Sequence, residues 1–145
     1  MGRLRCMFVV IIILFLSSIM VYAEGNKYIE IFDINQERVV KIIEPNEEVE
    51  GIVLNYLQEA DGFVAKCDPI PTEGYAIRVP LRSSVIMHNR WVNGTVSEII
   101  VMVSGKELEP FLVVFEDGDR FLCLSFKENL DKLSKALDFQ VTAFH

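Results

Sequence analysis

The first 23 residues limit what this chain can fold into, because they have the composition of an export signal and not of a globular core. Arg3 and Arg5 precede an apolar run at positions 6–20, and the segment closes on Val-Tyr-Ala23. Signal peptidase recognises such a positive start, apolar stretch and small residues three and one before the cut. We therefore predict cleavage between Ala23 and Glu24, and a secreted or extracytoplasmic domain after it.

The same leader (residues 1–23) has an alternative fate as an uncleaved membrane anchor. Its 17 residues at positions 6–22 span roughly 25 Å as a helix. That length is slightly below the hydrocarbon core of about 30 Å, yet above the roughly 7–15 apolar residues of a typical signal sequence. The Val-Tyr-Ala site favours cleavage, whereas retention would tether the domain to the membrane from outside the cytoplasm.

The 122 residues after the leader are enough for one domain with its own core. We assign residues 24–139 to a single globular domain and 140–145 to a C-terminal tail. Since only two of the 14 basic residues lie in the leader, the rest has 12 basic against 21 acidic residues, a net charge of −9. This acidity disfavours binding to nucleic acid or to anionic membrane surfaces, so membrane contact is expected only through the leader.

The first half of the domain predicts a hairpin followed by a helix. Residues 27–34 and 38–43 are rich in β-branched and aromatic side chains and flank a short polar turn. Residues 49–60 then carry apolar side chains at the spacing of one helical face, after Pro45-Asn46 and before Asp61-Gly62. A helix with a single apolar stripe is expected to pack on a sheet.

The second half predicts more strands and a closing helix. The last two strands are apolar on both faces, which indicates central strands covered on each side. Ser125 and Glu128 form a capping-box pattern, so a helix is expected to begin at Ser125. The expected strands are 63–67, 75–81, 84–92, 95–103, 111–115 and 120–124, with Arg82-Ser83-Ser84 and Asn93-Gly94 as turns.

Together these elements predict an α+β fold. We expect an antiparallel sheet of about seven to eight strands, in the order ββα-ββββββ-α, with two amphipathic helices packed on it. The hydrophobic signal or anchor helix precedes this domain.

Residues suited to catalysis or metal binding are scarce. The two histidines are His88 and His145, and no GxSxG, CxxC or His/Cys cluster accompanies them. We therefore expect no metal, no cofactor and no catalytic residues, with a small hydrolase centred on His88 as an alternative. Cys67 and Cys123 lie in apolar strands, where they are either two separate buried thiols or, in an exported chain, a disulfide.

Charge placement is the one uneven feature of the chain. Between Glu73 and Glu98 there is no acidic residue, and the basic residues there are Arg78, Arg82, His88 and Arg90. If Leu81 pairs with Val85, Arg78 lies opposite His88 with Arg90 beside it, which makes a cationic stripe on one strand face. Such a stripe suits the carboxylates or phosphates of an anionic partner. The alternative is that these arginines pair with acids from other strands.

These observations lead to a functional expectation of a small acidic exported domain that acts as a non-enzymatic binding module. Its partner would be an unknown protein or an anionic ligand, held at Arg78, His88, Arg90 and Arg82. The alternatives are a membrane-tethered accessory subunit and the small extracytoplasmic hydrolase centred on His88.

Overall fold

The computed structural model describes residues 27–64, 71–104 and 109–141. Seven strands form one antiparallel sheet in the order β2-β1-β4-β5-β6-β7-β3, so the predicted α+β class with two helices is confirmed. The expected signal or anchor helix lies outside the described residues. In chain order the elements are β1 (Ile29–Asp33), β2 (Arg38–Ile43), α2 (Glu47–Gln58), β3 (Gly62–Phe63), β4 (Gly74–His88), β5 (Asn93–Ser104), β6 (Phe111–Glu116), β7 (Arg120–Ser125) and α3 (Asp131–Leu137).

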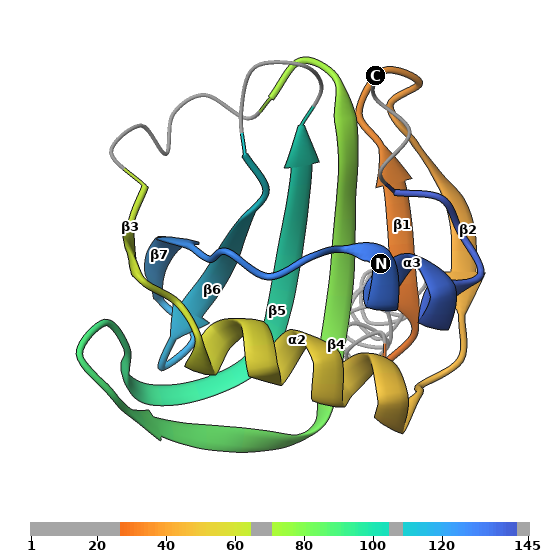
Figure 1. Cartoon of the computed structure of the whole chain (residues 1–145). Helices are drawn as coiled ribbons and strands as arrows, with labels where there is room; N and C mark the ends of the chain where they lie inside the picture. Colours follow the sequence, from red (N-terminus) through yellow and green to blue (C-terminus); the bar gives the residue numbers. More distant parts are fainter. Residues whose placement is uncertain (1–26, 65–70, 105–108, 142–145) are drawn as a thin grey trace, which may run out of the picture.

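Both helices lie on the same face of the sheet. Figure 1 shows α2 crossing β4 and β5, with α3 beside β1 and β2. The apolar stripes of the helices join the inward side chains of the strands in one core, which extends to Val141. We call this the helix side of the sheet.

The first helix matches its prediction at the start and is shorter at the end. The side chain of Asn46 accepts hydrogen bonds from the backbone N–H groups of Glu48 and Val49, at 2.8 and 3.3 Å, which satisfies amides that the helix itself leaves free. The helix ends at Gln58, and Gly62 belongs to β3 instead of the helix terminus.

The turn predicted at Arg82-Ser83-Ser84 is wrong, because β4 is one continuous strand of 15 residues. Its pairing with β5 shifts between Pro80, which lies opposite Glu98, and Val85, which lies opposite Val96. Pro80 has no N–H to donate to the ladder, and the extra residues on β4 form a bulge. The strand therefore bends and continues, as Figure 1 shows for the long β4–β5 hairpin.

The turn predicted at Asn93-Gly94 is also wrong, since both residues belong to β5. The chain reverses earlier, where the side-chain oxygen of Asn89 accepts hydrogen bonds from the N–H groups of Trp91 and Val92 at 2.8 and 2.7 Å. Gly94 instead allows Asp117 to come close to the strand, because a Cβ at position 94 would lie 2.7 Å from a carboxylate oxygen of Asp117.

The closing helix begins later than predicted. Ser125 is the last residue of β7, and its hydroxyl donates to Asp61 at 2.6 Å, so it caps no helix. Helix α3 begins at Asp131, whose N–H donates to the Asn129 side chain at 2.6 Å. The predicted apolar stripe is nevertheless buried: Phe126, Leu130, Leu133 and Leu137.

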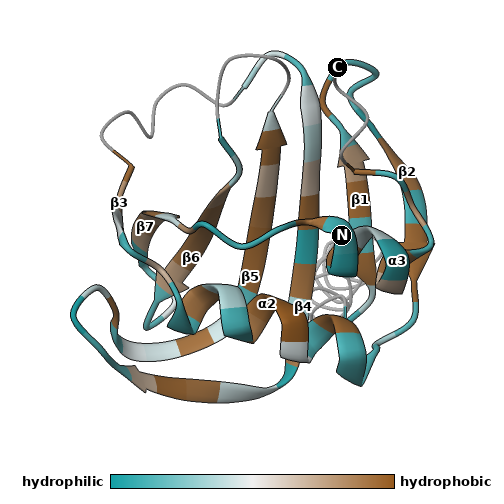
Figure 2. Cartoon of the chain, in the orientation of Figure 1, coloured by the Kyte–Doolittle hydropathy of each residue, from teal (hydrophilic) through white to brown (hydrophobic). Residues whose placement is uncertain are grey.

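The other face of β6 and β7 is buried as well, as predicted for strands covered on each side, since Phe111, Val113 and Cys123 are 8%, 7% and 5% exposed. Figure 2 shows hydrophobic residues along β5, β6 and β7. On the side away from the helices, Met102, Phe111, Val113 and Cys123 form a second, separate apolar cluster. Within the described residues no helix contributes to this cluster.

Candidate functional site

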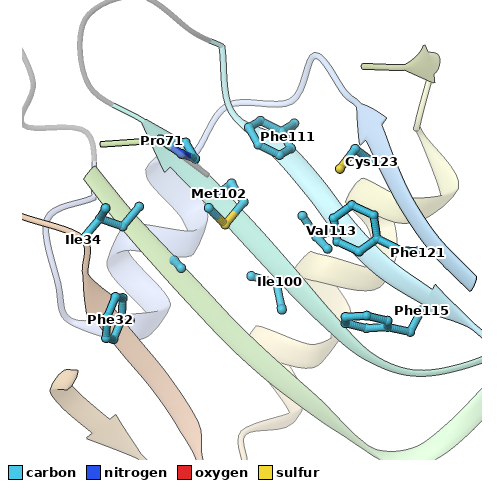
Figure 3. A pocket seen from close by; sticks show the side chains of 11 residues that line it. Phe32, Ile34, Pro71, Ile100, Met102, Phe111, Val113, Phe115, Phe121 and Cys123 are labelled. Carbon is cyan, nitrogen blue, oxygen red and sulfur yellow. The ribbon is translucent and has the colours of Figure 1, made fainter. Parts of the chain in front are cut away.

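The candidate site is an apolar pocket of about 280 Å³ on the side of the sheet away from the helices. Figure 3 shows Phe32 and Ile34 at one side of it and Phe115 and Phe121 at the other, with Ile100 between them. We call it the apolar pocket, and its lining is Phe32, Ile34, Pro71, Ala76, Ile100, Met102, Phe111, Val113, Phe115, Phe121 and Cys123.

Strand alternation in two apolar strands builds this pocket. Successive side chains of a strand point to opposite faces, so a strand that is apolar at every position presents an apolar row on each face. In β6, Leu112 and Val114 lie in the helix-side core with no exposed surface, while their neighbours line the pocket. In β7, Leu124 is buried under the helices and Cys123 faces the pocket.

The walls of the pocket are more exposed than its floor. Met102 is 6% exposed between the walls, whereas Phe32 is 37% and Phe121 is 52% exposed. Exposed aromatic rings beside a concave apolar surface are typical of interaction sites, because a partner removes their area from water. The exposed apolar surface continues beyond the pocket onto the edge strand β2. There Val39 lies opposite Phe32 of β1, and Ile42 lies opposite Glu30 of β1.

Arg78 lies on the same sheet face as the pocket, where it pairs with carboxylates. Its Nε is 3.0 Å from Glu98 and its Nη1 is 3.5 Å from Glu30. It lies opposite Glu30 on β1 and Ile100 on β5. The predicted position opposite His88 is therefore wrong, because it depended on the turn at Arg82-Ser83-Ser84.

Arg82 connects the sheet to the first turn of α2. Its Nε donates to Glu50 at 2.8 Å, its Nη1 donates to Glu47 at 2.9 Å, and its backbone N–H donates to the other oxygen of Glu50. The hydrogen bonds to Glu50 and then Glu47 raise the pKa of Arg82 above its usual range. The backbone amide that the bulge removes from the β4–β5 ladder thus has a carboxylate partner.

His88 and Arg90 lie at the distal end of the β4–β5 hairpin, separate from both other arginines. The Nδ1 atom of His88 is 2.8 Å from the side-chain oxygen of Asn93. The guanidinium of Arg90 lies over the ring of Trp91, 5.0 Å from its centroid. The structure therefore distributes the four basic residues over three places and does not bring them together.

The remaining predicted site residues are only partly described. Cys123 lines the apolar pocket and takes part in a disulfide bond. Cys67, together with Ala23 and Glu24 of the expected cleavage site, lies outside the described residues. The pairing of Cys67 with Cys123 and the cleavage position stay predictions.

The part of the chain that the structure describes has neither a metal cluster nor a membrane-spanning helix. Across 27–64, 71–104 and 109–141, no three His, Cys, Asp or Glu side chains come together as a metal site. The helices in these same ranges are too short or too polar to cross a membrane. Among the same residues, the one strongly shifted pKa belongs to Tyr56 on the helix side, where burial, followed by Glu128 and Asp131, raises it to about 12.

The sequence contained a signal for the apolar pocket. The two strands that are apolar at nearly every position, β6 and β7, supply five of its lining residues. The pattern shows that both faces avoid water, but not which face the chain's own helices cover.

Comparison with known proteins gives no significant match: no family model fits the sequence, and no curated protein or solved structure is significantly similar to it.

Proposed function

We propose that this protein is an exported, non-enzymatic binding module that holds its partner at the apolar pocket. The observation that carries the proposal is the exposure of Phe121, 52%, at the wall of a pocket that has no charged side chain among its described lining residues. Burial of such a ring contributes about 2 kcal/mol or more to association. The export part of the proposal comes from the leader sequence.

The arrangement of polar groups favours binding over catalysis. A catalytic site needs an acid, a base or a nucleophile at the reacting atoms. Among the lining residues that the structure describes, only Cys123 has such chemistry, and its sulfur is engaged in a disulfide. His88, on which the hydrolase alternative depends, lies beside Asn93 at the far end of the hairpin.

The pocket is also a better candidate for the binding surface than the arginines are. Arg78 and Arg82 already have carboxylates at 3.0 and 2.8 Å, so an anionic partner would have to displace them. Displacement would cost the existing hydrogen bonds, whereas the apolar pocket gains from any apolar group that fills it.

Dye binding tests the pocket directly. We expect the neutral dye N-phenyl-1-naphthylamine to bind the protein with saturable fluorescence. Binding should be largely lost when Phe32→Ser and Phe121→Ser are combined, because both rings form walls of the pocket and their exposure makes the changes tolerable to the fold. Ile86→Ser is the matched control, since Ile86 is 70% exposed and lies outside the pocket lining.

Photo-crosslinking tests the function in the native compartment. A photoreactive phenylalanine at position 121 should give a discrete adduct, and the same group at position 86 should not. Equal labelling from both positions, or dye binding that survives the double substitution, would show that the pocket is not the binding surface.

A further inference from the structure

Asn93 is the one asparagine of the chain that a serine or threonine follows two positions later. Asparagine, then any residue except proline, then serine or threonine is the acceptor sequence for N-linked sugars in exported proteins. Here the acceptor sequence is Asn93-Gly94-Thr95, and an apolar leader of the kind that directs export precedes it. So short a pattern also arises by chance, and the geometry at these positions decides whether it is usable.

The structure places Asn93 where a sugar can be attached. Asn93 is the exposed first residue of β5, at the distal end of the β4–β5 hairpin and at the outer edge of the molecule (Figure 1). Its Oδ1 accepts a hydrogen bond from Nδ1 of His88 at 2.8 Å. Its Nδ2, the atom that carries the sugar in N-linked attachment, has no hydrogen-bond partner among the described residues.

The fold holds the acceptor sequence by its backbone and leaves its side chains available. The chain reversal before β5 is closed by the side chain of Asn89, so Asn93 has no turn to stabilise. The backbone N–H of Asn93 donates to Glu116 at 3.0 Å, and that of Thr95 donates to Asp117 at 2.8 Å. A sugar on the Asn93 side chain would break neither bond.

An exposed apolar side chain lies beside the acceptor. In the β4–β5 ladder Thr95 lies opposite Ile86, and Asn93 lies opposite His88. Side chains of opposite residues share a sheet face, so Asn93 and Ile86 are diagonal neighbours with Cβ atoms roughly 7–8 Å apart. Ile86 is 70% exposed, more than any other large apolar side chain of the described residues. The C–H groups of a sugar on Asn93 would shield it from water.

We propose that Asn93 is a site of N-glycosylation and that the first sugar covers Ile86. The donor is an oligosaccharide linked to a lipid pyrophosphate, and a transferase of the export compartment joins it to the chain. Nδ2 of Asn93 forms a bond to the anomeric carbon of the first sugar, while the bond from that carbon to the pyrophosphate oxygen breaks. The oxygen keeps the electron pair, and the amide loses one proton, which balances the charge of the departing lipid pyrophosphate.

This inference rests on the export part of the proposed function and not on the apolar pocket. Neither Asn93 nor Ile86 belongs to the described lining of that pocket. Ligand binding at the pocket and glycosylation at the hairpin can therefore fail independently of each other.

Mass spectrometry of the protein purified from its own export compartment tests the attachment. We expect the peptide that contains Asn93 to be heavier than its sequence by whole sugar residues. An amidase that cleaves between asparagine and the first sugar should remove this mass in water labelled with heavy oxygen, and leave a labelled aspartate at position 93. The same incubation without the amidase is the control, because an Asn-Gly sequence also loses ammonia spontaneously.

Variants expressed in the same source assign the sugar to this acceptor sequence. Asn93→Gln should lose the sugar, because the amide moves outward by one methylene group. Thr95→Val keeps the β-branched shape that suits a strand and should also lose the sugar, because it lacks the hydroxyl. Thr95→Ser is the matched control, which keeps the hydroxyl and should keep the sugar. Circular dichroism of each variant checks that it is folded.

Hydroxyl-radical labelling tests the contact with Ile86. Labelling of Ile86 should rise several-fold when the sugar is removed, whereas labelling of Ile42, which is 62% exposed on β2, should not change. Unchanged labelling of Ile86 would show that the sugar points away from it.

The remaining outcomes separate this inference from the export on which it rests. Exported protein with an unmodified Asn93 would overturn the glycosylation and leave export intact. Protein found in the cytoplasm with its leader still attached would contradict both.

Discussion

Arg78 and Glu98 are joined across β4 and β5 by a 3.0 Å contact, and Glu30 approaches the same guanidinium from β1 at 3.5 Å. Each of the three side chains is about a quarter exposed, so water screens the pairs only in part. The arginine lies between two carboxylates and weakens the repulsion between them. Its position is explained by the stability of the sheet without any external anion.

Replacement of Arg78 by leucine is therefore expected to destabilise the fold by about 1–2 kcal/mol, because Glu30 and Glu98 lose their shared cation. Urea unfolding followed by circular dichroism measures the change. Arg90→Leu is the control, since Arg90 is exposed and loses only its contact with Trp91, about 0.5–1 kcal/mol. A larger loss at position 90 than at position 78 would contradict this account.

Arg82 should stabilise the protein through α2, and the effect should depend on Glu50. The Arg82 side chain is 50% exposed and its ion pairs are screened by water, so we expect Arg82→Ala to lower the free energy of unfolding only slightly. Combination with Glu50→Gln should lower the free energy of unfolding by less than the sum of the two single losses. Strict additivity in this double-mutant cycle would show that the 2.8 Å contact between Arg82 and Glu50 does not contribute to stability.

Local features of the sequence were sufficient to predict those elements whose stabilising groups are close together in the chain. Helix α2 has its apolar stripe, its Asn46 cap and its first-turn glutamates within a dozen residues. The β6–β7 hairpin likewise contains its own turn at 117–119. Propensity and spacing describe such elements well because their partners are neighbours.

The errors arose where distant residues decide the local structure. The bulge in β4 is satisfied by Glu50, 32 residues earlier than Arg82, so the short polar run there resembled a turn. Asn-Gly at 93–94 has the strongest hairpin signal, yet the Asn89 side chain closes the turn first and Gly94 packs against Asp117. A wrong turn then shifted the register and brought Arg78 opposite His88 in the prediction.

The apolar pocket was not predicted from the sequence, for a different physical reason. A strand face that avoids water has the same residues whether it is covered by the chain's own helix or by a partner. The sequences of β6 and β7 indicate two apolar faces, and only the three-dimensional arrangement shows that α2 and α3 pack on one of them. Sequence patterning thus identifies buried faces without identifying what buries them.

Two glycine substitutions are expected to act in opposite directions. Gly51 lies on the exposed face of α2, and a Cβ added there would have no atom within 4 Å, so Gly51→Ala should stabilise by about 0.5–1 kcal/mol. Gly74 has φ of +117° and an added Cβ would collide with the carbonyl oxygen of Val103, so Gly74→Ala should cost about 3 kcal/mol or more. Thermal unfolding of the two variants compares them, and a stable Gly74→Ala protein would contradict the strand geometry at that position.

Tyr56 should make stability fall at alkaline pH. Its ring stacks on Phe126 with centroids 4.7 Å apart, and its hydroxyl donates to the carbonyl oxygen of Asn129 at 3.0 Å. Burial first, and then Glu128 and Asp131, raise its pKa to about 12, against about 10 in the unfolded chain. The fold therefore favours the neutral phenol, and this stability is fully present below pH 10 and is lost as the pH rises towards 12.

Comparison with Tyr56→Phe isolates this contribution, because the other tyrosines and the lysines titrate in both proteins. The difference in unfolding free energy between the two proteins should be constant up to about pH 9. Between pH 9 and pH 12 the tyrosine protein should lose about 2 kcal/mol relative to Tyr56→Phe. Spectrophotometric titration at 295 nm should show one phenol that ionises only as the protein unfolds. A difference that stays constant across this pH range would mean that Tyr56 ionises as readily in the folded protein as in the unfolded chain, and the desolvation argument would be wrong.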